Sequence, residues 1–74
     1  MIRLADRIVV DPAIRSGRPV IEGTRVPVDV LVGHVAAGMT VEAVAEEYGI
    51  SRDDVLAALA YAAQSIASEE IRAV

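Results

Sequence analysis

Arginines are the residues of this chain best suited to bind another molecule. All seven cationic side chains are arginines, and a planar guanidinium forms paired hydrogen bonds with carboxylate and phosphate groups. Two of them, Arg18 and Arg25, lie in the stretch GRPVIEGTRVPV, whose prolines and glycines are typical of a rigid turn. We therefore predict a partner-binding segment here, with the contact residues Arg18, Glu22, Thr24 and Arg25.

The same stretch contains the residues that would hold those side chains in place. We predict that Gly23 has a positive φ in a two-residue Gly-Thr turn, which would set Glu22 opposite Arg25 as a cross-strand ion pair. Pro27 is predicted to form the joint between the strands and the helices. A Walker-type phosphate loop requires a lysine, and the chain has none.

Residues that could carry catalysis or bind a metal are sparse. His34 is the only histidine and the chain has no cysteine, so a zinc site lacks ligands. Ser51 is better explained as a helix cap than as a nucleophile. Solvated helix faces and first-turn positions account for the clustered acids, which are Glu46, Glu47, Asp53 and Asp54. We predict that the protein is not an enzyme and has no catalytic residue, metal or cofactor.

The elements that must position the arginines are two short strands. Ile8-Val9-Val10 is a β-branched run that ends at Asp11-Pro12, which predicts a strand over residues 7–10. The residue before a proline is pushed towards an extended conformation. That restriction predicts a second strand over 19–22 and an extended segment over 25–27.

Three helices are predicted to follow. Apolar residues recur at helical spacing from Val28 onwards, and Gly38 and Gly49 stand where left-handed residues end helices. Thr40 and Ser51 are suited to cap the second and third helices. The predicted helices cover residues 28–37, 41–48 and 52–67, the last with an extension into the C-terminal tail.

These elements predict a mainly α fold and a single domain over residues 1–74. Residues 1–27 form the small β element, and residues 28–74 form a three-helix domain and the C-terminal tail. The second helix, its turn and the third helix have the layout of a helix-turn-helix of homeodomain-like or winged type.

Charge is distributed unevenly along the chain. Five of the seven arginines lie within residues 1–25, whereas eight of the eleven acids lie beyond them. A recognition helix that begins Ser-Arg-Asp-Asp presents carboxylates to DNA phosphates, which disfavours DNA binding. One alternative nevertheless stays open, a dimeric DNA-binding repressor with the phosphate contacts Arg3, Arg7, Arg15 and Arg52.

The apolar content indicates association. Hydrophobic residues make up 54% of the chain, without any Phe or Trp, and small aliphatic side chains give a thin core. The third helix carries more apolar positions than one core needs, so we predict a homodimer or partner face of Leu56, Leu59, Ala63 and Ile66. A homo-oligomeric structural module with no other partner is a further alternative.

Two features of the sequence concern membrane insertion and export. No uninterrupted apolar run reaches the roughly 18 residues of a membrane span. The N-terminus MIRLADR contains two arginines and an aspartate where a signal peptide needs an apolar stretch. We therefore expect a cytoplasmic protein that contacts no membrane.

A longer pattern runs through most of the chain. A strand ending in Asp-Pro is followed by a Gly-x-Pro-x-Ile-x-Gly-Thr-Arg-x-Pro-Val block, an Ala-Gly-Met-Thr segment and a Val-x-x-Ala-Leu-x-Tyr-Ala helix. Over residues 8–62 this pattern resembles the domain of unknown function family 433 (DUF433). One departure is Tyr48-Gly49, where the family often has Tyr-Pro.

The resemblance implies a winged or homeodomain-like helical fold with a small N-terminal β element, commonly dimeric. It also implies an antitoxin of VapBC-like type, encoded beside a PIN-like ribonuclease toxin. The leading hypothesis is therefore a non-enzymatic antitoxin-like protein that neutralises such a toxin. Arg25 or Arg18 would pair with the carboxylates that hold Mg²⁺ in the nuclease.

Overall fold

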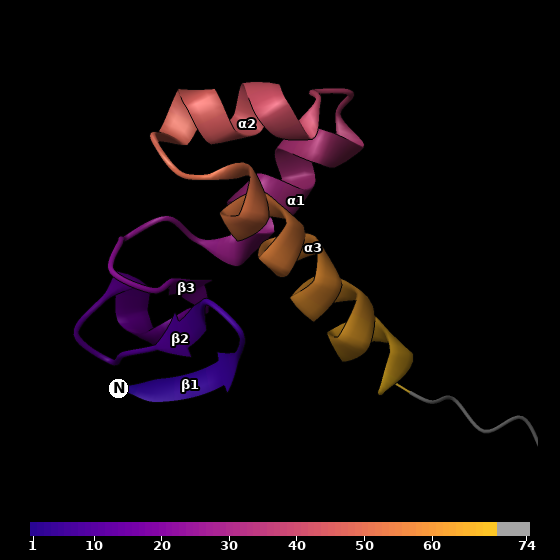
Figure 1. The fold of residues 1–74 in the computed structure, drawn as a ribbon. Helices are drawn as coiled ribbons and strands as arrows, with labels where there is room; N and C mark the ends of the chain where they lie inside the picture. The colour runs from indigo at the N-terminus through magenta and orange to yellow at the C-terminus, as the bar shows by residue number, and fades with distance from the viewer. Residues whose placement is uncertain (70–74) are drawn as a thin grey trace, which may run out of the picture.

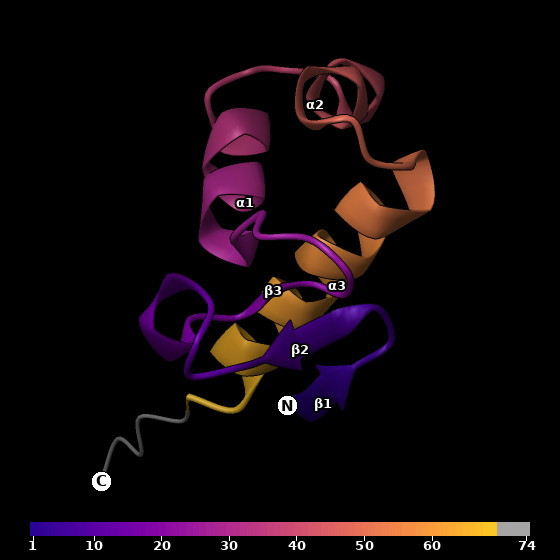
Figure 2. The same cartoon turned by 90° about the vertical axis from the view of Figure 1, so that its left-hand side faces the viewer.

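A computed structural model of the chain describes residues 1–69, and it places a small sheet at one end of three helices (Figures 1 and 2). In both views α2 lies at the opposite end from the sheet, and α3 runs from near α2 to about the level of β1. The elements in chain order are β1 (Ile2–Ala5), β2 (Ile8–Val10), the short turn η1 (Arg15–Gly17), β3 (Val20–Ile21), α1 (Val28–Ala36), α2 (Val41–Tyr48) and α3 (Arg52–Ala67).

The sheet has three antiparallel strands in the order β1-β2-β3. The predicted strands over 7–10 and 19–22 correspond to β2 and β3, which are shorter by one or two residues. The prediction of only two strands was wrong, because β1 pairs with β2 along Ile2–Ala5. Ile2 and Leu4 are 65% and 42% exposed, so β1 lacks the alternation of buried and exposed residues that marks a strand in a sequence.

The helices begin and end close to the predicted positions. α2 and α3 have the predicted bounds, and α1 ends one residue earlier. The Thr40 side chain accepts a hydrogen bond from the Ala43 N–H at 3.0 Å, and Ser51 forms a capping box with Asp54. Gly38 and Gly49 follow α1 and α2 with φ of 108° and 64°. No helix within residues 1–69 is long and apolar enough to cross a membrane.

The predicted extension of the third helix is described only in part. Ser68 follows the last residue of α3 as its C-terminal cap. The remainder of that prediction falls on residues 70–74, which lie outside the described residues.

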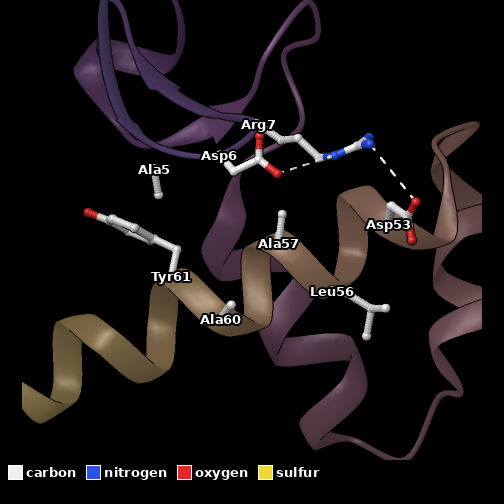
Figure 3. Close-up of a pocket in the computed structure, with 8 residues that line it drawn as sticks. All are labelled: Ala5, Asp6, Arg7, Asp53, Leu56, Ala57, Ala60 and Tyr61. Carbon is white, nitrogen blue, oxygen red and sulfur yellow. Dashed lines mark ion pairs between the residues drawn. The ribbon is translucent and has the colours of Figure 1, made fainter.

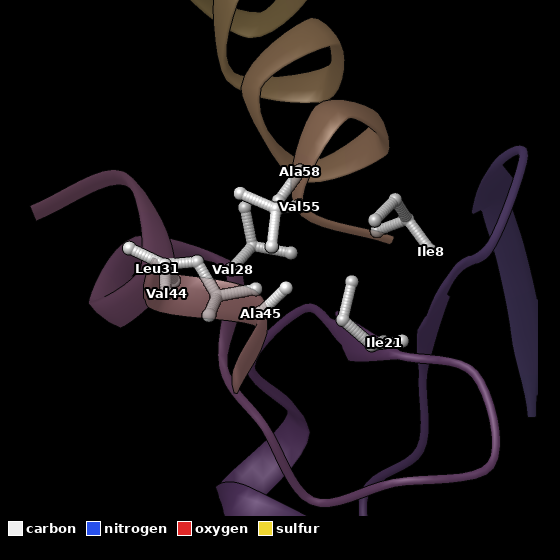
Figure 4. Close-up of a cluster of buried hydrophobic side chains, with 8 residues drawn as sticks. All are labelled: Ile8, Ile21, Val28, Leu31, Val44, Ala45, Val55 and Ala58. Carbon is white, nitrogen blue, oxygen red and sulfur yellow. The ribbon is translucent and has the colours of Figure 1, made fainter. Parts of the chain in front are cut away.

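One cluster of buried aliphatic side chains joins the sheet to all three helices (Figure 4). Its largest members are almost fully buried, and α3 contributes to it from the face that packs on α1, α2 and β2. The cluster consists of Ile8, Ile21, Val28, Leu31, Val44, Ala45, Val55 and Ala58. Because these side chains meet at the N-terminal half of α3, the C-terminal half of that helix extends beyond the core (Figure 1).

Candidate partner-binding site

A tight turn after β3 fixes the central part of the predicted partner-binding segment. Gly23 has a φ of 79°, and the Thr24 N–H donates to the Ile21 carbonyl at 3.0 Å, as in a type II turn. The Thr24 hydroxyl donates to the same carbonyl at 2.8 Å and accepts from the Val26 N–H at 3.0 Å. The central residues of the turn are therefore Glu22 and Gly23, one position earlier than the predicted Gly-Thr pair. Thr24 therefore holds the turn through its side chain.

The predicted ion pair between Glu22 and Arg25 was wrong. Glu22 instead accepts a hydrogen bond from Arg3 of β1, with 2.7 Å between Nη2 and Oε1. The cause is the shifted turn, which places Glu22 inside the loop, together with β1, which brings Arg3 within reach. Arg25 is exposed, and residues 1–69 provide it with no ion-pair partner.

Arg18 differs from Arg25 because it is paired within its own chain. Its guanidinium donates to the carboxylate of Asp29, in the first turn of α1. The positive end of the helix dipole also stabilises a carboxylate at this position. Both side chains remain largely exposed, so the pair lies at the surface with one charge of each sign.

A cluster of ion pairs around Arg7 connects the sheet to α3 (Figure 3). Arg7, in the turn between β1 and β2, donates to Oδ1 of Asp54 at 3.0 Å and lies 3.9 Å from Asp53 and 3.8 Å from Asp6. The hydrogen bond to Asp54 is the main cause that raises the pKa of Arg7, and the nearby carboxylates add to it. Partial burial acts to raise the pKa of Asp54, but hydrogen bonds from Ser51 and Arg7 outweigh it and lower this pKa.

Two grooves flank α3. The strand-side groove has a volume of about 360 Å³ and lies between α3 and the β1–β2 turn (Figure 3). The helix-side groove has a volume of about 410 Å³ and lies between α3, the start of α1 and the residues before β3. The strand-side groove is lined by Ala5, Asp6, Arg7, Asp53, Leu56, Ala57, Ala60 and Tyr61. The helix-side groove is lined by Arg18, Pro19, Val28, Asp29, Val32, Gly33, Tyr61, Ala62, Ser65 and Ile66.

The residues of the predicted dimer or partner face do not all line one groove. Leu56 is 36% exposed and lines the strand-side groove, whereas Ile66 is 67% exposed and lines the helix-side groove. Leu59 is half-buried against the core, and Ala63 is exposed. Tyr61, which was not among the predicted site residues, lines both grooves.

The arginines considered for phosphate contacts are mostly engaged with carboxylates. Besides Arg3 and Arg7, Arg52 donates to Glu42 at 2.9 Å. That hydrogen bond is the main cause that lowers the pKa of Glu42. Arg15 is exposed in η1, and residues 1–69 offer it no ion-pair partner.

The only histidine joins two helices. Nε2 of His34, in the last turn of α1, lies 2.6 Å from the hydroxyl of Tyr48 at the end of α2. Their rings are tilted by 45° with centroids 5.5 Å apart. No group of three or more His, Asp or Glu side chains among residues 1–69 is arranged to hold a metal ion.

The structure defines a small protein in which a three-stranded sheet and three helices share one core, and two grooves flank the last helix. A family model described as "Protein of unknown function (DUF433)" matches residues 8–62. The chain belongs to this family.

Two comparisons give relatives in Mycobacterium tuberculosis. The chain is 40% identical over 63 residues to a protein of strain ATCC 25618 / H37Rv named "Putative antitoxin VapB45", and the match covers 80% of this chain and 26% of the relative. The crystal structure of Rv2018 from the same species is similar with a TM-score of 0.65 and 40% identity, over 70% of this chain and 24% of that one. The chain thus spans about a quarter of the length of these relatives.

Proposed function

We propose that this protein is a non-enzymatic antitoxin-like protein, which binds and neutralises a PIN-like ribonuclease toxin and acts as a homodimer in the cytoplasm. The name of the relative VapB45 supports the antitoxin role. The observation that carries the proposed mechanism is the position of Arg25, an exposed cation on a turn that Thr24 and Gly23 hold in place.

Arg25 is the arginine of the segment best suited to a partner's carboxylates. A PIN-type nuclease binds Mg²⁺ through clustered acids, and a guanidinium forms short, strong hydrogen bonds with such groups. Because Arg18 is already paired with Asp29, its donors are less available for this task. Arg25 on the toxin's acids would exclude metal or substrate, and inhibition would follow from occupation of the site.

We propose that the helix-turn-helix builds the core and does not bind DNA. We assign α2, the turn at Gly49 and α3 to a homeodomain-like arrangement that builds the core around Val44 and Val55. The first turn of α3 contains Asp53 and Asp54, which would face phosphates unfavourably. Binding of DNA in the major groove is therefore not part of the proposal.

The test is co-purification with the product of the neighbouring gene, followed by a ribonuclease assay on the complex. We expect Arg25→Ala to weaken inhibition by about thirtyfold or more, since truncation of one partner of a buried charge pair costs about 2 kcal/mol or more. Arg15→Ala is the matched control, because it removes another exposed arginine for which residues 1–69 offer no ion-pair partner.

The outcomes separate the parts of this proposal. Full inhibition by the Arg25→Ala variant would remove Arg25 from the mechanism and leave the antitoxin role standing. A nuclease that neither co-purifies with the wild-type protein nor loses activity in its presence would contradict the antitoxin role itself.

A further inference from the structure

The helix-side groove is an apolar surface with balanced charge at its rim. Val32 of α1 and Ile66 of α3 line the groove, and Ile66 is exposed although it is a large aliphatic residue. Arg18 and Asp29 lie at the rim as an exposed ion pair. In Figures 1 and 2 the C-terminal half of α3 continues past α1.

We propose that two copies of this chain pair through the helix-side groove, with Ile66 of each copy entering the groove of the other. This inference rests on the homodimer of the proposed function and assigns its interface. The groove is lined in part by the small residues Gly33, Ala62 and Ser65. Small residues allow the helix of a second copy to approach closely.

The charges at the rim favour a second copy over a different partner. In a two-fold interface each residue meets its counterpart in reciprocal fashion, so that a residue i contacts j and j contacts i. A rim with one cation and one anion is complementary to itself under that symmetry. Arg18 of each copy then faces Asp29 of the other, and the two surface pairs join into one cluster of alternating charges.

The strand-side groove does not meet this condition. Its rim contains the acids Asp6 and Asp53 with the single cation Arg7. Two copies brought together there would place an excess of carboxylates face to face, which is repulsive. The groove between α1 and α3 is therefore the surface that suits a second copy.

A charge-reversal experiment tests the interface. Arg18→Asp and Asp29→Arg are prepared separately, and each variant's self-association is compared with that of the wild type by sedimentation. We expect each single variant to lose most of its dimer, because like charges face each other across the interface. An equimolar mixture of the two variants should restore dimers.

Native mass spectrometry of the mixture shows whether those dimers contain one copy of each variant. Heterodimers in excess of the share that random pairing gives would support the interface. A mixture that stays monomeric, or dimers that pair at random, would overturn it. Mixing also controls for folding, since a misfolded chain would not be rescued by its counterpart.

Ile66→Glu tests the apolar part of the groove. We expect this exposed position to tolerate the change in the monomer and the dimer to be lost, since the carboxylate would be buried at the interface. Leu56→Glu, an equally simple change on α3 in the strand-side groove, should leave the dimer intact. A dimer that survives Ile66→Glu and dissociates with Leu56→Glu would place the interface in the other groove.

These results are distinguishable from failure of the proposed function. A wild-type protein that is monomeric at all accessible concentrations would contradict both this inference and the homodimer. Toxin inhibition through Arg25 would still be decided by its own assay, because Arg25 is not among the residues that line the helix-side groove.

Discussion

Arg7 and Asp54, which are 47 residues apart in sequence, are joined by a hydrogen bond of 3.0 Å between the β1–β2 turn and the first turn of α3. The same carboxylate accepts a hydrogen bond from the Ser51 N–H at 3.1 Å and so completes the capping box. One side chain therefore both starts the helix and holds the sheet against it.

The pH dependence of stability should report on this carboxylate. The pKa of Asp54 is lower in the folded chain than its ordinary value of 3.8, so the ionised form stabilises the fold. Its contribution is complete above the unfolded pKa and is lost as the pH falls from about 3.8 through the folded pKa. We expect the free energy of unfolding, measured in urea, to fall over that range.

The control for this effect is Asp54→Asn, which removes the titrating group and preserves its shape. In that variant the decline below 3.8 should be smaller than in the wild type. An equal decline in both proteins would show that other carboxylates, such as Glu42 with its own lowered pKa, dominate acid unfolding.

Removal of the N-cap of α3 should destabilise the protein by about 1 kcal/mol. In Ser51→Ala the Asp54 N–H loses the hydroxyl that accepts its hydrogen bond at 3.0 Å. Urea unfolding followed by circular dichroism measures the loss. Ser68→Ala is the control, since Ser68 is exposed and its hydroxyl bonds only to the Ser65 carbonyl among the described residues. A similar loss in both variants would contradict a specific capping effect.

Truncation in the core should have a much larger effect. Leu31 is fully buried beside Val44 in the core cluster (Figure 4), and Leu31→Ala should cost about 2–5 kcal/mol. Since small domains are stable by only about 5–15 kcal/mol in total, the thermal transition should broaden and move to a markedly lower temperature. Leu56→Ala, which truncates a partly exposed leucine of α3, should change stability far less.

Two glycines should respond to alanine in opposite directions. Gly23 has a φ of 79° with open space around it, so Gly23→Ala should destabilise the turn by about 1 kcal/mol through backbone strain alone. Gly33 lies within α1, and a methyl group there would meet no atom within 4 Å. Gly33→Ala should therefore stabilise the isolated chain by up to about 1 kcal/mol.

Gly23→Ala also tests whether the turn itself matters for the partner contact. If Arg25 acts through the rigidity of its turn, Gly23→Ala should reduce toxin inhibition more than its loss of stability explains. Gly49→Ala strains another glycine of positive φ outside the turn and the helix-side groove, so it should reduce inhibition only as far as its loss of stability explains. An equal reduction in both variants would show that the turn does not need its present geometry.

The helices were predictable because their signals are local. Thr40 and Ser51 cap the residues that follow them, and Gly49 ends α2 within the same few positions. Apolar spacing then identifies the buried face of each helix. No information from distant parts of the chain is needed for these assignments.

The sheet and the ion pairs were less predictable because they depend on distant residues. β1 buries little apolar surface, and its partner is fixed only by the register with β2. Glu22 has an arginine three positions away, yet it pairs with Arg3 because the sheet brings β1 alongside. The hydrogen bond between Arg7 and Asp54 could not be predicted from local sequence, because the two residues are 47 positions apart.

The positions of the two tyrosines allow optical measurements without an added label. The chain has no tryptophan, so Tyr48 and Tyr61 account for its near-ultraviolet emission. Tyr48 lies against His34 between α1 and α2, whereas Tyr61 lines both grooves of α3. With Tyr48→Phe the remaining fluorescence comes from Tyr61 alone, and its change on association would follow coverage of the grooves in real time.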